Sequence, residues 1–588
     1  MSGEPFEDSR RLTGANLYFD GAGAALETAP GMAVDAGMLQ RWRDRVVQAR
    51  DVLGWPPGAI VVRTHATGAS LAFEAPFDQL YVATEVNEWA LYAALGIRAG
   101  DAPVDADAEA PRPHVAHFDD DEALRQLHAL ATAEAKPALR ALAEAARVRS
   151  VPAHADDEVL SLGEGEAAQA WPLDALPAID AVPWQDLRAI PKAVVTGSNG
   201  KTTTVRLLAA MLGAHGLRAG YSSTDGLFVD GALVEAGDYS GPVGARTVLR
   251  DPRVQSAVLE TARGGLLRRG LVADDARVAV VTNVSADHFG EYGIHSLDDI
   301  AAVKLVVARS LGADGLLVLN ADDVMLVAHA PPGRRTGWFA LELGDAAARG
   351  LPACGVRDGR LVLVLADGEH DLGVVAEMPL SVGGAARYNI ANIAAASLAA
   401  SALGIAPATI AGVLARFGAR NADNPGRLQR WTLGDVEVLL DYAHNPDGLQ
   451  GLLDVAAGLR REGRLALLLG HAGNRLESDF RALAAVAAAA RPDRVWLKDI
   501  GGDYLRGRAS GDVALILRDA LHAAGMDEAD LPVCLDEAEA ARQALAWARA
   551  GDLLVLPVHE PARRDVVVGL LDALQAGGWR AGQPLPAG

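Results

Sequence analysis

The sequence predicts a multidomain α/β protein whose central part is a parallel sheet carrying a phosphate-binding loop. The first observation is a glycine-rich loop, Gly197–Thr202, that joins a short apolar strand, Ala193–Thr196, to a helix over Thr203–His215. The second is an alternation of short apolar runs with helical segments beyond that loop, which is typical of βαβ units. The third is the length of 588 residues, which is too great for one hydrophobic core.

Residues 1–188 are predicted to form an α+β domain that precedes the sheet. Short apolar runs around a turn-like segment indicate two strands, and apolar residues at helical spacing follow them. The expected elements are strands at Ile60–Arg63 and Ser70–Glu74, a helix at Tyr81–Leu95, and one or two helices within Asp119–Ala146. A proline-rich stretch with little periodicity, residues 171–191, indicates a linker to the next domain.

Residues 189–424 are predicted to form the central domain, and residues 425–588 a smaller, Rossmann-like α/β domain. The boundary is placed at Asn424–Arg427, where proline and glycine interrupt the pattern. The further strands expected in the central sheet are Ser256–Leu259, Val278–Thr282 and Gly315–Leu319. Those expected in the C-terminal domain are Val436–Leu440, Leu465–Leu469, Arg494–Leu497 and Asp552–Pro557.

The composition favours a small-molecule or short-peptide substrate. The formal net charge is −22, which repels nucleic acid and anionic membranes, and no dense run of Lys and Arg offsets it. No stretch of about 18 apolar residues predicts a membrane span, and the acidic N-terminus lacks a signal-peptide pattern, so we expect a cytoplasmic protein. Cys354 and Cys534 lie in apolar stretches and are expected to be core thiols, although a disulfide between them stays open.

The loop between strand and helix has the chemistry of a phosphate site. Glycines let backbone N–H groups converge on phosphate oxygens, and the helix N-terminus adds its dipole. Lys201 can reach the β- and γ-phosphates of a nucleotide, and the Thr202 hydroxyl can ligate Mg²⁺. The alternative is a glycine-rich turn without a ligand. The residues expected to contact the nucleotide here are Gly197, Ser198, Asn199, Gly200, Lys201, Thr202 and Thr203.

The loop and several later segments resemble the Mur ligases and folylpolyglutamate synthetases, which join a carboxylate to an amine at the expense of ATP. The loop has the short spacing Gly-x-x-Gly-Lys-Thr of these enzymes. The later segments that resemble theirs, in the same order, are Thr282–His288, Lys304, Asn320–Asp323, Tyr388–Asn392 (with Tyr388 at the usual His), Pro425–Arg427 and Asp441–Pro446. The resemblance implies a three-domain Mur-ligase-like fold and an ADP-forming acid–amino-acid ligase.

One branch of the family is more similar than the others. Segments that look like the Mur-ligase-type C-terminal module of cyanophycin synthetase are Ser223–Gly226, Gly237–Pro242, Leu259–Arg268 and Leu505–Arg508. This resemblance covers roughly residues 190–588. No Gly-rich loop of the ATP-grasp module of that enzyme is recognisable in residues 1–188, so complete cyanophycin synthesis by this chain alone is not expected.

The resemblance implies roles for individual residues. Thr202 and Glu260 are expected to hold the Mg²⁺ that bridges the phosphates, and His288 to help hold a second one. Lys304 corresponds to a lysine that many Mur ligases carry carbamylated; the alternatives are a lysine paired with phosphate and a solvated lysine on a helix. Catalytic roles are therefore expected for Lys201, His288 and Lys304.

The C-terminal half is expected to complete the ATP site. By resemblance, Asn392 contacts adenine, Asp441 the ribose, and Arg427 the phosphates when the domains close over bound ATP. Four arginines are candidates for binding substrate carboxylates, with structural ion pairs as the equal alternative: Arg263, Arg268, Arg506 and Arg508.

Other classes of function remain open from the sequence. A P-loop ATPase or kinase would use the same loop for hydrolysis or phosphoryl transfer, and a non-catalytic scaffold is the third class. The leading hypothesis is a ligase that joins an amino acid to an acidic amino acid or short acidic peptide. Residues 1–188 are expected to bind substrate, to mediate homo-oligomerisation or to dock a partner enzyme.

Overall fold

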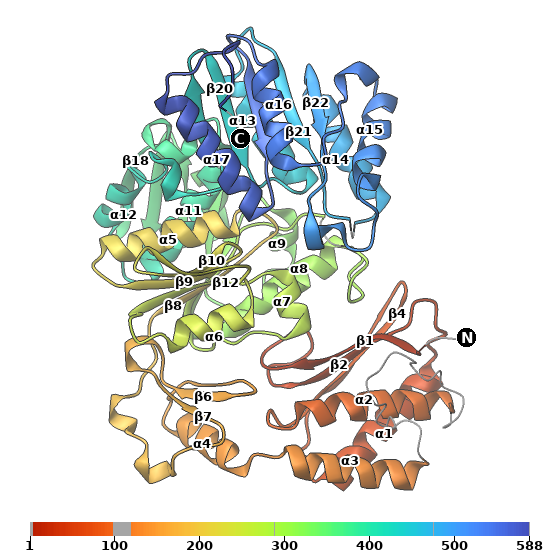
Figure 1. Ribbon diagram of the computed structural model, residues 1–588. Coiled ribbons are helices and arrows are strands. Elements are labelled where there is room, and N and C mark those ends of the chain that lie inside the picture. Colours follow the sequence, from red (N-terminus) through yellow and green to blue (C-terminus); the bar gives the residue numbers. More distant parts are fainter. Residues whose placement is uncertain (1–3, 98–118, 287–288, 474, 587–588) are drawn as a thin grey trace. The chain divides into compact units, whose positions relative to one another are not determined.

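The computed structural model describes residues 4–97, 119–286, 289–473 and 475–586 (Figure 1). The chain divides into two compact units, which are described separately. The first consists of Met1–Phe339, Ala346–Ala353 and Ala395–Ala406, and the second of Ala340–Asp345, Cys354–Ala394 and Pro407–Gly588. The domain boundaries at 188 and 424 stay a prediction.

The first unit begins with an antiparallel sheet of order β1-β2-β4-β3 that packs against helices α1 and α2. Its elements are β1 (Phe6–Leu12), β2 (Gly23–Thr28), α1 (Ala36–Leu53), β3 (Ile60–His65), β4 (Gly68–Glu74), α2 (Leu80–Leu95) and α3 (Asp120–Glu134). Trp42, Phe73 and Trp89 are fully buried in this core, and the Trp42 indole N–H donates to Asn87 Oδ1 at 3.0 Å. Such burial of aromatic side chains stabilises a small α+β layer pair, and it confirms the predicted strands and the first predicted helix.

A helix and a small antiparallel sheet connect this layer to the central sheet. They are α4 (Pro137–Val148), β5 (Ala153–Ala155), β6 (Val159–Leu162) and β7 (Gln169–Pro172). Glu164, just after β6, accepts from the Lys192 ammonium at 2.7 Å, and both side chains are fully buried. This ion pair fixes the first strand of the central sheet to the connector.

The central sheet confirms the predicted parallel arrangement. In the first unit its order is β11-β10-β9-β12-β8-β13-β14-β15, with parallel pairing from β9 to β15. Its elements are β8 (Lys192–Thr196), α5 (Lys201–Ala214), β9 (Ala219–Ser223), β10 (Gly226–Val229), β11 (Ala232–Ala236), α6 (Pro242–Arg250), β12 (Ser256–Glu260), α7 (Arg263–Arg268), β13 (Ala276–Val281), α8 (Leu297–Leu305), β14 (Leu311–Asn320), α9 (Val324–Ala328) and β15 (Thr336–Glu342). The carboxyl ends of β8, β12 and β13 therefore meet at one edge, the usual place for a ligand in such sheets.

The second unit contains the predicted C-terminal domain, a sheet of order β19-β20-β23-β21-β22 with helices on it. Two helices, α10 (Leu343–Arg349) and α11 (Arg387–Ala402), have residues in both units. The other elements before the C-terminal sheet are β16 (Ala353–Arg357), β17 (Arg360–Leu365), β18 (Gly368–Val374) and α12 (Pro407–Leu414). Those of the C-terminal sheet are β19 (Gln429–Leu433), β20 (Val436–Asp441), α13 (Pro446–Leu459), β21 (Leu465–Leu469), α14 (Glu477–Ala489), β22 (Arg494–Leu497), α15 (Asp512–Ala523), α16 (Glu537–Trp547), β23 (Leu553–Pro557) and α17 (Pro561–Ala576). All strands from β20 onward run parallel.

The structure also bears on the cysteines and on membrane-spanning helices. Cys354 and Cys534 are free thiols, the first buried and the second partly buried. No helix within the described residues is long and apolar enough to cross a membrane.

Candidate functional site

The glycine-rich loop lies between β8 and α5, and its backbone requires glycine at both ends. Gly197 has φ +148° and Gly200 has φ +87°, a region that L side chains rarely adopt. A Cβ at position 197 would lie 1.8 Å from Thr282 Oγ1, closer than any atom tolerates. The loop therefore passes directly against the end of β13, and the Ser198 N–H donates to the Asn283 carbonyl at 3.0 Å.

Lys201 begins α5 and folds over this loop. Its ammonium donates to the carbonyl oxygens of Gly197 at 3.0 Å and Ser198 at 3.1 Å. An ammonium has three N–H donors, so these two bonds leave one for a phosphate oxygen. Thr203, in the first turn of the same helix, is 4% exposed. The first turn of α5 thus combines the Lys201 cation with the positive end of the helix dipole, which together favour an anion.

The end of β13 braces the loop through side chains. The Asn199 N–H donates to Asn283 Oδ1 at 2.8 Å, and the Thr282 hydroxyl donates to the Asn199 carbonyl at 2.6 Å. The Ser285 N–H donates to Ser198 Oγ at 3.0 Å. The segment that begins at Thr282, which resembles a Mur-ligase motif, therefore fixes the conformation of the loop at Ser198 and Asn199.

Glu260 ends β12 beside the loop and is 1% exposed. Its two oxygens accept from Thr202 Oγ1 and Thr224 Oγ1, each at 2.8 Å. Each threonine hydroxyl donates its proton to the carboxylate, so the lone pairs of its oxygen stay available as ligands for a hard cation such as Mg²⁺. Sequence reasoning did not single out Thr224, although its Ser-Thr-Asp-Gly segment was among those that resemble the cyanophycin-synthetase module.

Lys304 lies in the last turn of α8 and is 3% exposed, so it is not a solvated surface lysine. Asp323 caps α9 and also accepts from the Val284 N–H at 2.6 Å, which ties the end of β14 to that of β13. His288 lies outside the described residues, and its expected metal role stays a prediction.

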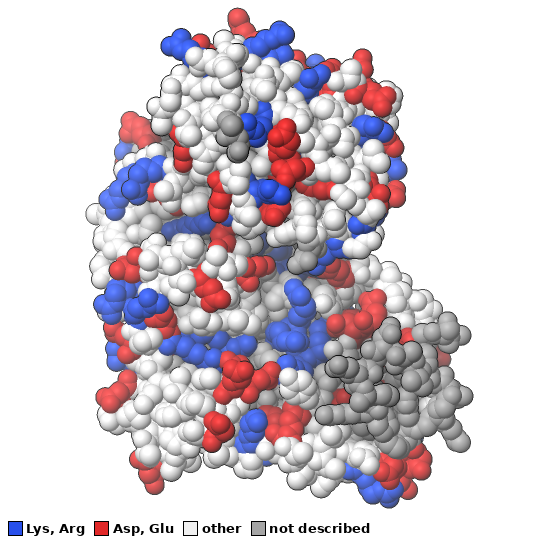
Figure 2. Space-filling view, viewed as in Figure 1, with Lys and Arg blue, Asp and Glu red and all other residues white. Residues whose placement is uncertain are grey.

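The arginines of the first unit divide into one that is paired and one that is exposed. Arg263 is 8% exposed and pairs with Glu291 at 2.5 Å. Arg268 is exposed, and its Nε donates to the Gly264 carbonyl at 3.2 Å. Basic side chains gather over α6 and α7 on the face drawn in Figure 2. Arg263 therefore already has an ion-pair role, whereas Arg268 is accessible to a substrate carboxylate.

The second unit contains the three residues that the resemblance places around the nucleotide, Asn392, Arg427 and Asp441, and brings the last two together. Asp441, 9% exposed at the end of β20, accepts from the Leu428 N–H at 2.6 Å. Burial raises the pKa of Asp441, and the nearby Arg427 guanidinium opposes that rise. Arg427 lies 4.4 Å from the Tyr442 ring centroid in a cation–π contact. These contacts hold Arg427 beside a carboxylate at the carboxyl edge of the C-terminal sheet.

Asn392 lies on α11, where its amide donates to Asn389 Oδ1 at 3.3 Å. It is 4% exposed. Tyr388, which stands where the family has His, lies near Asp441, and burial raises its pKa well above the ordinary value. The tyrosine is therefore neutral at physiological pH, so the exchange for His removes a titratable base from this position.

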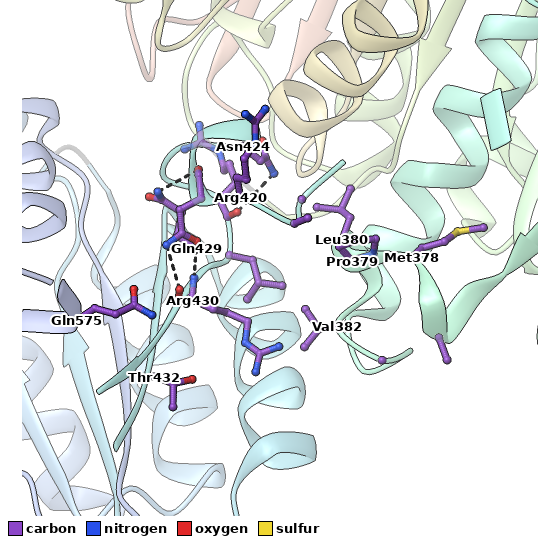
Figure 3. Close-up of a pocket in the computed structure, with 17 residues that line it drawn as sticks. Met378, Pro379, Leu380, Val382, Arg420, Asn424, Gln429, Arg430, Thr432 and Gln575 are labelled. Carbon is purple, nitrogen blue, oxygen red and sulfur yellow. Dashed lines mark hydrogen bonds between the residues drawn. The ribbon is translucent and has the colours of Figure 1, made fainter. Parts of the chain in front are cut away.

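A pocket of about 380 Å³ adjoins the linker segment that carries Arg427 (Figure 3). Met378, Pro379 and Leu380 line one side of it, and Gln429 and Arg430 the other. The cation of Arg420 is already paired with Asp423 at 2.8 Å. The pocket is therefore a mixed polar and apolar hollow, and we assign it no ligand.

The two candidate arginines of the last domain differ. Arg508 donates to the Gly473 carbonyl at 2.8 Å and lies over the Phe480 ring, so it holds the loop after β21. Arg506 is exposed and has φ +50°. Of the two, Arg506 is the one accessible to a substrate carboxylate.

His471 lies at the carboxyl edge of the C-terminal sheet and makes the C-terminal domain sensitive to acid. Burial lowers the pKa of His471 from 6.5 to about 3, and the charge of Arg475 and the neighbouring His444 and His559 add to that effect. The unfolded chain therefore binds a proton below pH 6.5 that the folded chain does not. Stability is complete above that pH and falls by up to about 1.4 kcal/mol per pH unit below it.

This slope is measurable by urea unfolding between about pH 5 and 6.5, above the titration of most carboxylates. We expect His471→Gln to flatten the slope, and the exposed His522→Gln variant to leave it unchanged. An unchanged slope in the His471 variant would show that this histidine is not the acid-sensitive group.

The family models of known proteins match both halves of this site. The model "Mur ligase middle domain" matches residues 195–400, and "Mur ligase, glutamate ligase domain" matches residues 426–557. The first match contains the glycine-rich loop and Glu260, and the second contains Arg427 and Asp441.

Curated relatives agree with these models. Cyanophycin synthetase of Crocosphaera subtropica is 36% identical over 390 residues, which are 65% of this chain and 44% of that protein. That of Trichormus variabilis is 38% identical over 389 residues, or 65% and 42% of the two chains. The chain thus spans less than half the length of these relatives.

A relative of more similar extent is UDP-N-acetylmuramoyl-L-alanyl-D-glutamate--2,6-diaminopimelate ligase of Xanthomonas campestris. It is 30% identical over 396 residues, which are 62% of this chain and 72% of that enzyme. Among solved structures, E. coli FolC in complex with DHPP and ADP is 21% identical, with a TM-score of 0.48 over 66% of this chain and 89% of that one. The two family models and the Xanthomonas campestris relative identify the chain as a member of the Mur ligase family.

Proposed function

We propose that the protein is an ATP-dependent, ADP-forming ligase that joins an amino acid to an acidic amino acid or short acidic peptide, in the manner of a cyanophycin synthetase. The observation that carries this proposal is the hydrogen-bonded pair of Thr202 and Glu260 beside the loop of Lys201, at 2.8 Å. The pair lies in a chain that belongs to a family of carboxylate–amine ligases.

The residues fit Mg²⁺ by their donor chemistry. Thr202 and Glu260 offer hard oxygen ligands, the kind that Mg²⁺ prefers, and the Glu260 carboxylate is almost fully buried. A buried carboxylate is costly unless it is paired with positive charge or hydrogen bonds. Bound there, Mg²⁺ would neutralise charge that develops between the phosphates. His288 is proposed for a second ion.

The chemistry proceeds in two balanced steps. A carboxylate oxygen of the acidic substrate attacks the γ-phosphorus of ATP, and the bond to the β–γ bridging oxygen breaks to release ADP. The amine nitrogen of the second substrate then attacks the acyl carbon, the C–O bond to phosphate breaks, and one proton leaves the nitrogen. Phosphate departs with the oxygen that the carboxylate supplied.

The chain's own residues lower the barrier of the first step, which brings an anion against a polyanion. The ammonium of Lys201 and the positive end of the α5 dipole would stabilise phosphate oxygens as their charge grows. We propose that Asn392 contacts adenine, Asp441 the ribose and Arg427 the phosphates. Arg268 and Arg506, both exposed, are the proposed contacts for substrate carboxylates, ahead of Arg263 and Arg508.

We propose that Lys304, which is 3% exposed, is carbamylated, because it corresponds to a lysine that many Mur ligases carry in that form. We expect the turnover rate to fall about tenfold in CO₂-depleted buffer and to recover with bicarbonate. The reason is that the carbamate would supply a negatively charged oxygen ligand for a metal ion. The rate of Lys304→Ala should not respond to bicarbonate. A wild-type rate indifferent to CO₂ would contradict the carbamate.

The proposed function is tested by ADP release with and without substrates. Acidic amino acids and aspartyl or glutamyl peptides are combined with each of the common amino acids, and the product is identified by mass spectrometry. We expect ADP release to require both a carboxylate and an amine. Turnover independent of both would instead support a P-loop ATPase, and a phosphorylated product a kinase.

A further inference from the structure

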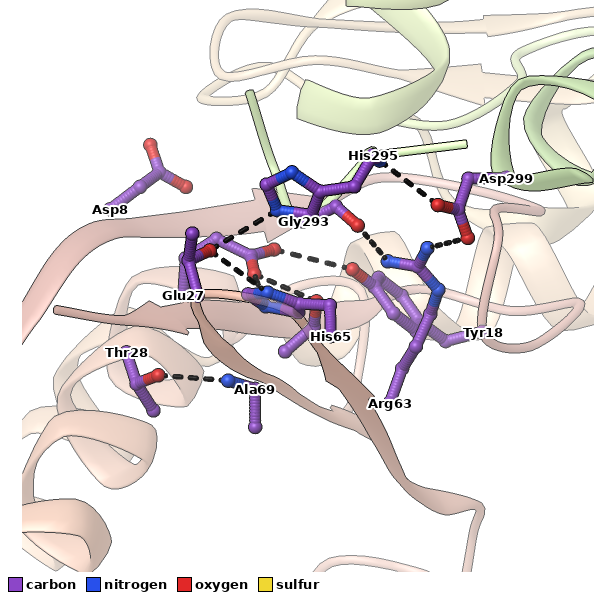
Figure 4. Close-up of polar contacts among 12 residues, drawn as sticks. Asp8, Tyr18, Glu27, Thr28, Arg63, His65, Ala69, Gly293, His295 and Asp299 are labelled. Atoms are coloured by element: carbon purple, nitrogen blue, oxygen red, sulfur yellow. Dashed lines mark hydrogen bonds and ion pairs between the residues drawn. The ribbon is translucent and has the colours of Figure 1, made fainter. Parts of the chain in front are cut away.

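The N-terminal sheet contacts the segment that leads into α8, and Figure 4 shows the side chains involved. Arg63, on β3, donates to the Gly293 carbonyl at 3.0 Å and forms an ion pair with Asp299. The residues joined in this way are 230 and 236 positions apart in the chain. One guanidinium thus holds both the loop before α8 and the first turn of that helix.

Asp299 lies in the first turn of α8, which begins at Leu297, and forms a capping box with the N-cap residue Ser296. Its Oδ2 accepts from the Ser296 hydroxyl at 2.8 Å and from the N–H groups of His295 and Ser296, while Ser296 caps the helix in return. Burial raises the pKa of Asp299, but these hydrogen bonds and the charge of Arg63 outweigh it and hold that pKa below its ordinary value. The carboxylate is therefore charged and fixed, and α8 starts from a defined point.

The turn between β3 and β4 adds a second contact with the same loop. The Thr67 hydroxyl lies 3.2 Å from His295 Nε2, and the His65 and His295 rings are 5.6 Å apart. A Cβ at Gly293 would lie 2.4 Å from His65 Cδ2. Because Gly293 has φ +66° and touches this ring, the loop follows the surface of the hairpin closely.

Arg10, on β1, links two segments of the central domain. It donates to the Leu267 carbonyl at 2.8 Å, and its guanidinium lies 4.6 Å from the Tyr292 ring centroid. It is 4% exposed and pairs with the buried Glu27 at 2.7 Å. A buried ion pair contributes little net stability. We therefore expect the pair to matter mainly because it holds the Arg10 guanidinium in contact with the Leu267 carbonyl and the Tyr292 ring.

We infer that the N-terminal sheet is a positioning element of the ligase site, and that Arg63 is the residue through which it fixes α8 and Lys304. The inference rests on the proposed function for its catalytic consequence only. Lys304 lies at the far end of the nine-residue helix that Arg63 anchors at its start. The segment Phe289–His295, held by Arg63 and Thr67, also leads in sequence from His288 to that helix. This role differs from substrate binding, oligomerisation or docking of a partner.

The first test is hydrogen–deuterium exchange of the full-length chain, which needs no turnover. We expect Arg63→Met to raise exchange of the amides in residues 290–305 by about tenfold or more, with no change in residues 201–214. The matched control is Arg41→Met, since Arg41 donates to the Ala94 carbonyl at 2.8 Å within the N-terminal layer. Its effect should be confined to α1 and α2. Unchanged exchange over 290–305 in Arg63→Met would overturn the inference.

The second test separates positioning from general destabilisation by kinetics. We expect Arg63→Met to lower kcat by about 10- to 100-fold, because small misplacements of reacting groups are costly. KM for ATP should stay within about twofold, because Arg63 is not among the contacts described for the loop of Lys201. Arg63→Lys should recover part of kcat, since one ammonium cannot bridge Gly293 and Asp299 as a guanidinium does.

The two tests distinguish failure of the proposed ligase function from failure of the positioning role of Arg63. If wild-type protein shows no substrate-dependent ADP release but Arg63→Met loosens residues 290–305, the proposed function fails and the positioning contact stands. If wild-type protein is an active ligase and Arg63→Met keeps both its kcat and its exchange pattern, the positioning role fails alone. A fall in kcat equal to that of Arg41→Met would also overturn it.

Discussion

Replacing Lys201 with alanine is expected to lower substrate-dependent ADP release by about 10³-fold or more, an effect of about 4 kcal/mol on the barrier. The reason is electrostatic, since the first step brings a carboxylate against the γ-phosphate and Lys201 is the cation placed at the loop. Its ammonium lies 3.0 Å from the Gly197 carbonyl and 3.1 Å from that of Ser198. Removal of the side chain leaves the positive end of the α5 dipole without the full charge of the ammonium.

The measurement is kcat and KM for ATP in a coupled ADP assay at saturating acidic substrate and amine. Lys201→Arg keeps the charge but not the compact ammonium, and we expect it to recover only part of the rate. Lys136→Ala, a lysine at the start of α4, is the matched control and should behave as wild type. Wild-type turnover by Lys201→Ala would contradict the assignment of this loop and reopen a non-catalytic role.

The second large effect is expected at Glu260. Glu260→Ala should lower kcat by about 10²-fold and raise the Mg²⁺ concentration for half-maximal rate by about tenfold, because it removes a carboxylate from the proposed metal position. It also leaves the hydroxyls of Thr202 and Thr224 without the acceptor that each contacts at 2.8 Å. The buried Thr202 hydroxyl and the partly buried Thr224 hydroxyl would then have to donate to water or reorient.

Glu260→Gln separates these two causes. The amide oxygen still accepts one hydroxyl, so stability should be largely kept while the Mg²⁺ dependence shifts as in the alanine variant. Glu235→Gln, at an exposed position on β11, is the control for loss of one negative charge. An unaltered Mg²⁺ dependence in both Glu260 variants would remove Glu260 from the metal site and leave it a hydrogen-bonding residue only.

The parallel sheets could be predicted from sequence because their strands are buried on both faces. Runs such as Ala193–Thr196 and Leu465–Leu469 are continuous and apolar, and their burial leaves little ambiguity about what they form. In the central sheet, β9, β15 and β16 escaped prediction, although β9 and β15 pair in parallel. The strands β10, β11, β17 and β18 also escaped, and these belong to short antiparallel hairpins. All five residues of β11 are exposed, which shows why hydrophobicity gives no signal there.

The glycine-rich loop could be recognised from the chain order of strand, loop and helix. Glu260 was expected only because its segment resembles the cyanophycin-synthetase module, and the roles of both stay predictions. Thr224, Asn283 and Arg63 did not stand out, because each is an ordinary polar residue whose partner is distant in sequence. The Arg63 contact with Asp299 spans 236 residues, and no periodicity or spacing encodes such a pair.

The central claim, activation of a carboxylate as an acyl phosphate, is tested most directly by the fate of oxygen. An accepted aspartyl or glutamyl substrate is labelled with ¹⁸O in its carboxylate and turned over with ATP and the amine. The account predicts one ¹⁸O atom in each phosphate released, in a one-to-one ratio with amide product. Unlabelled phosphate, with both labelled oxygens still in the substrate carboxylate, would contradict it.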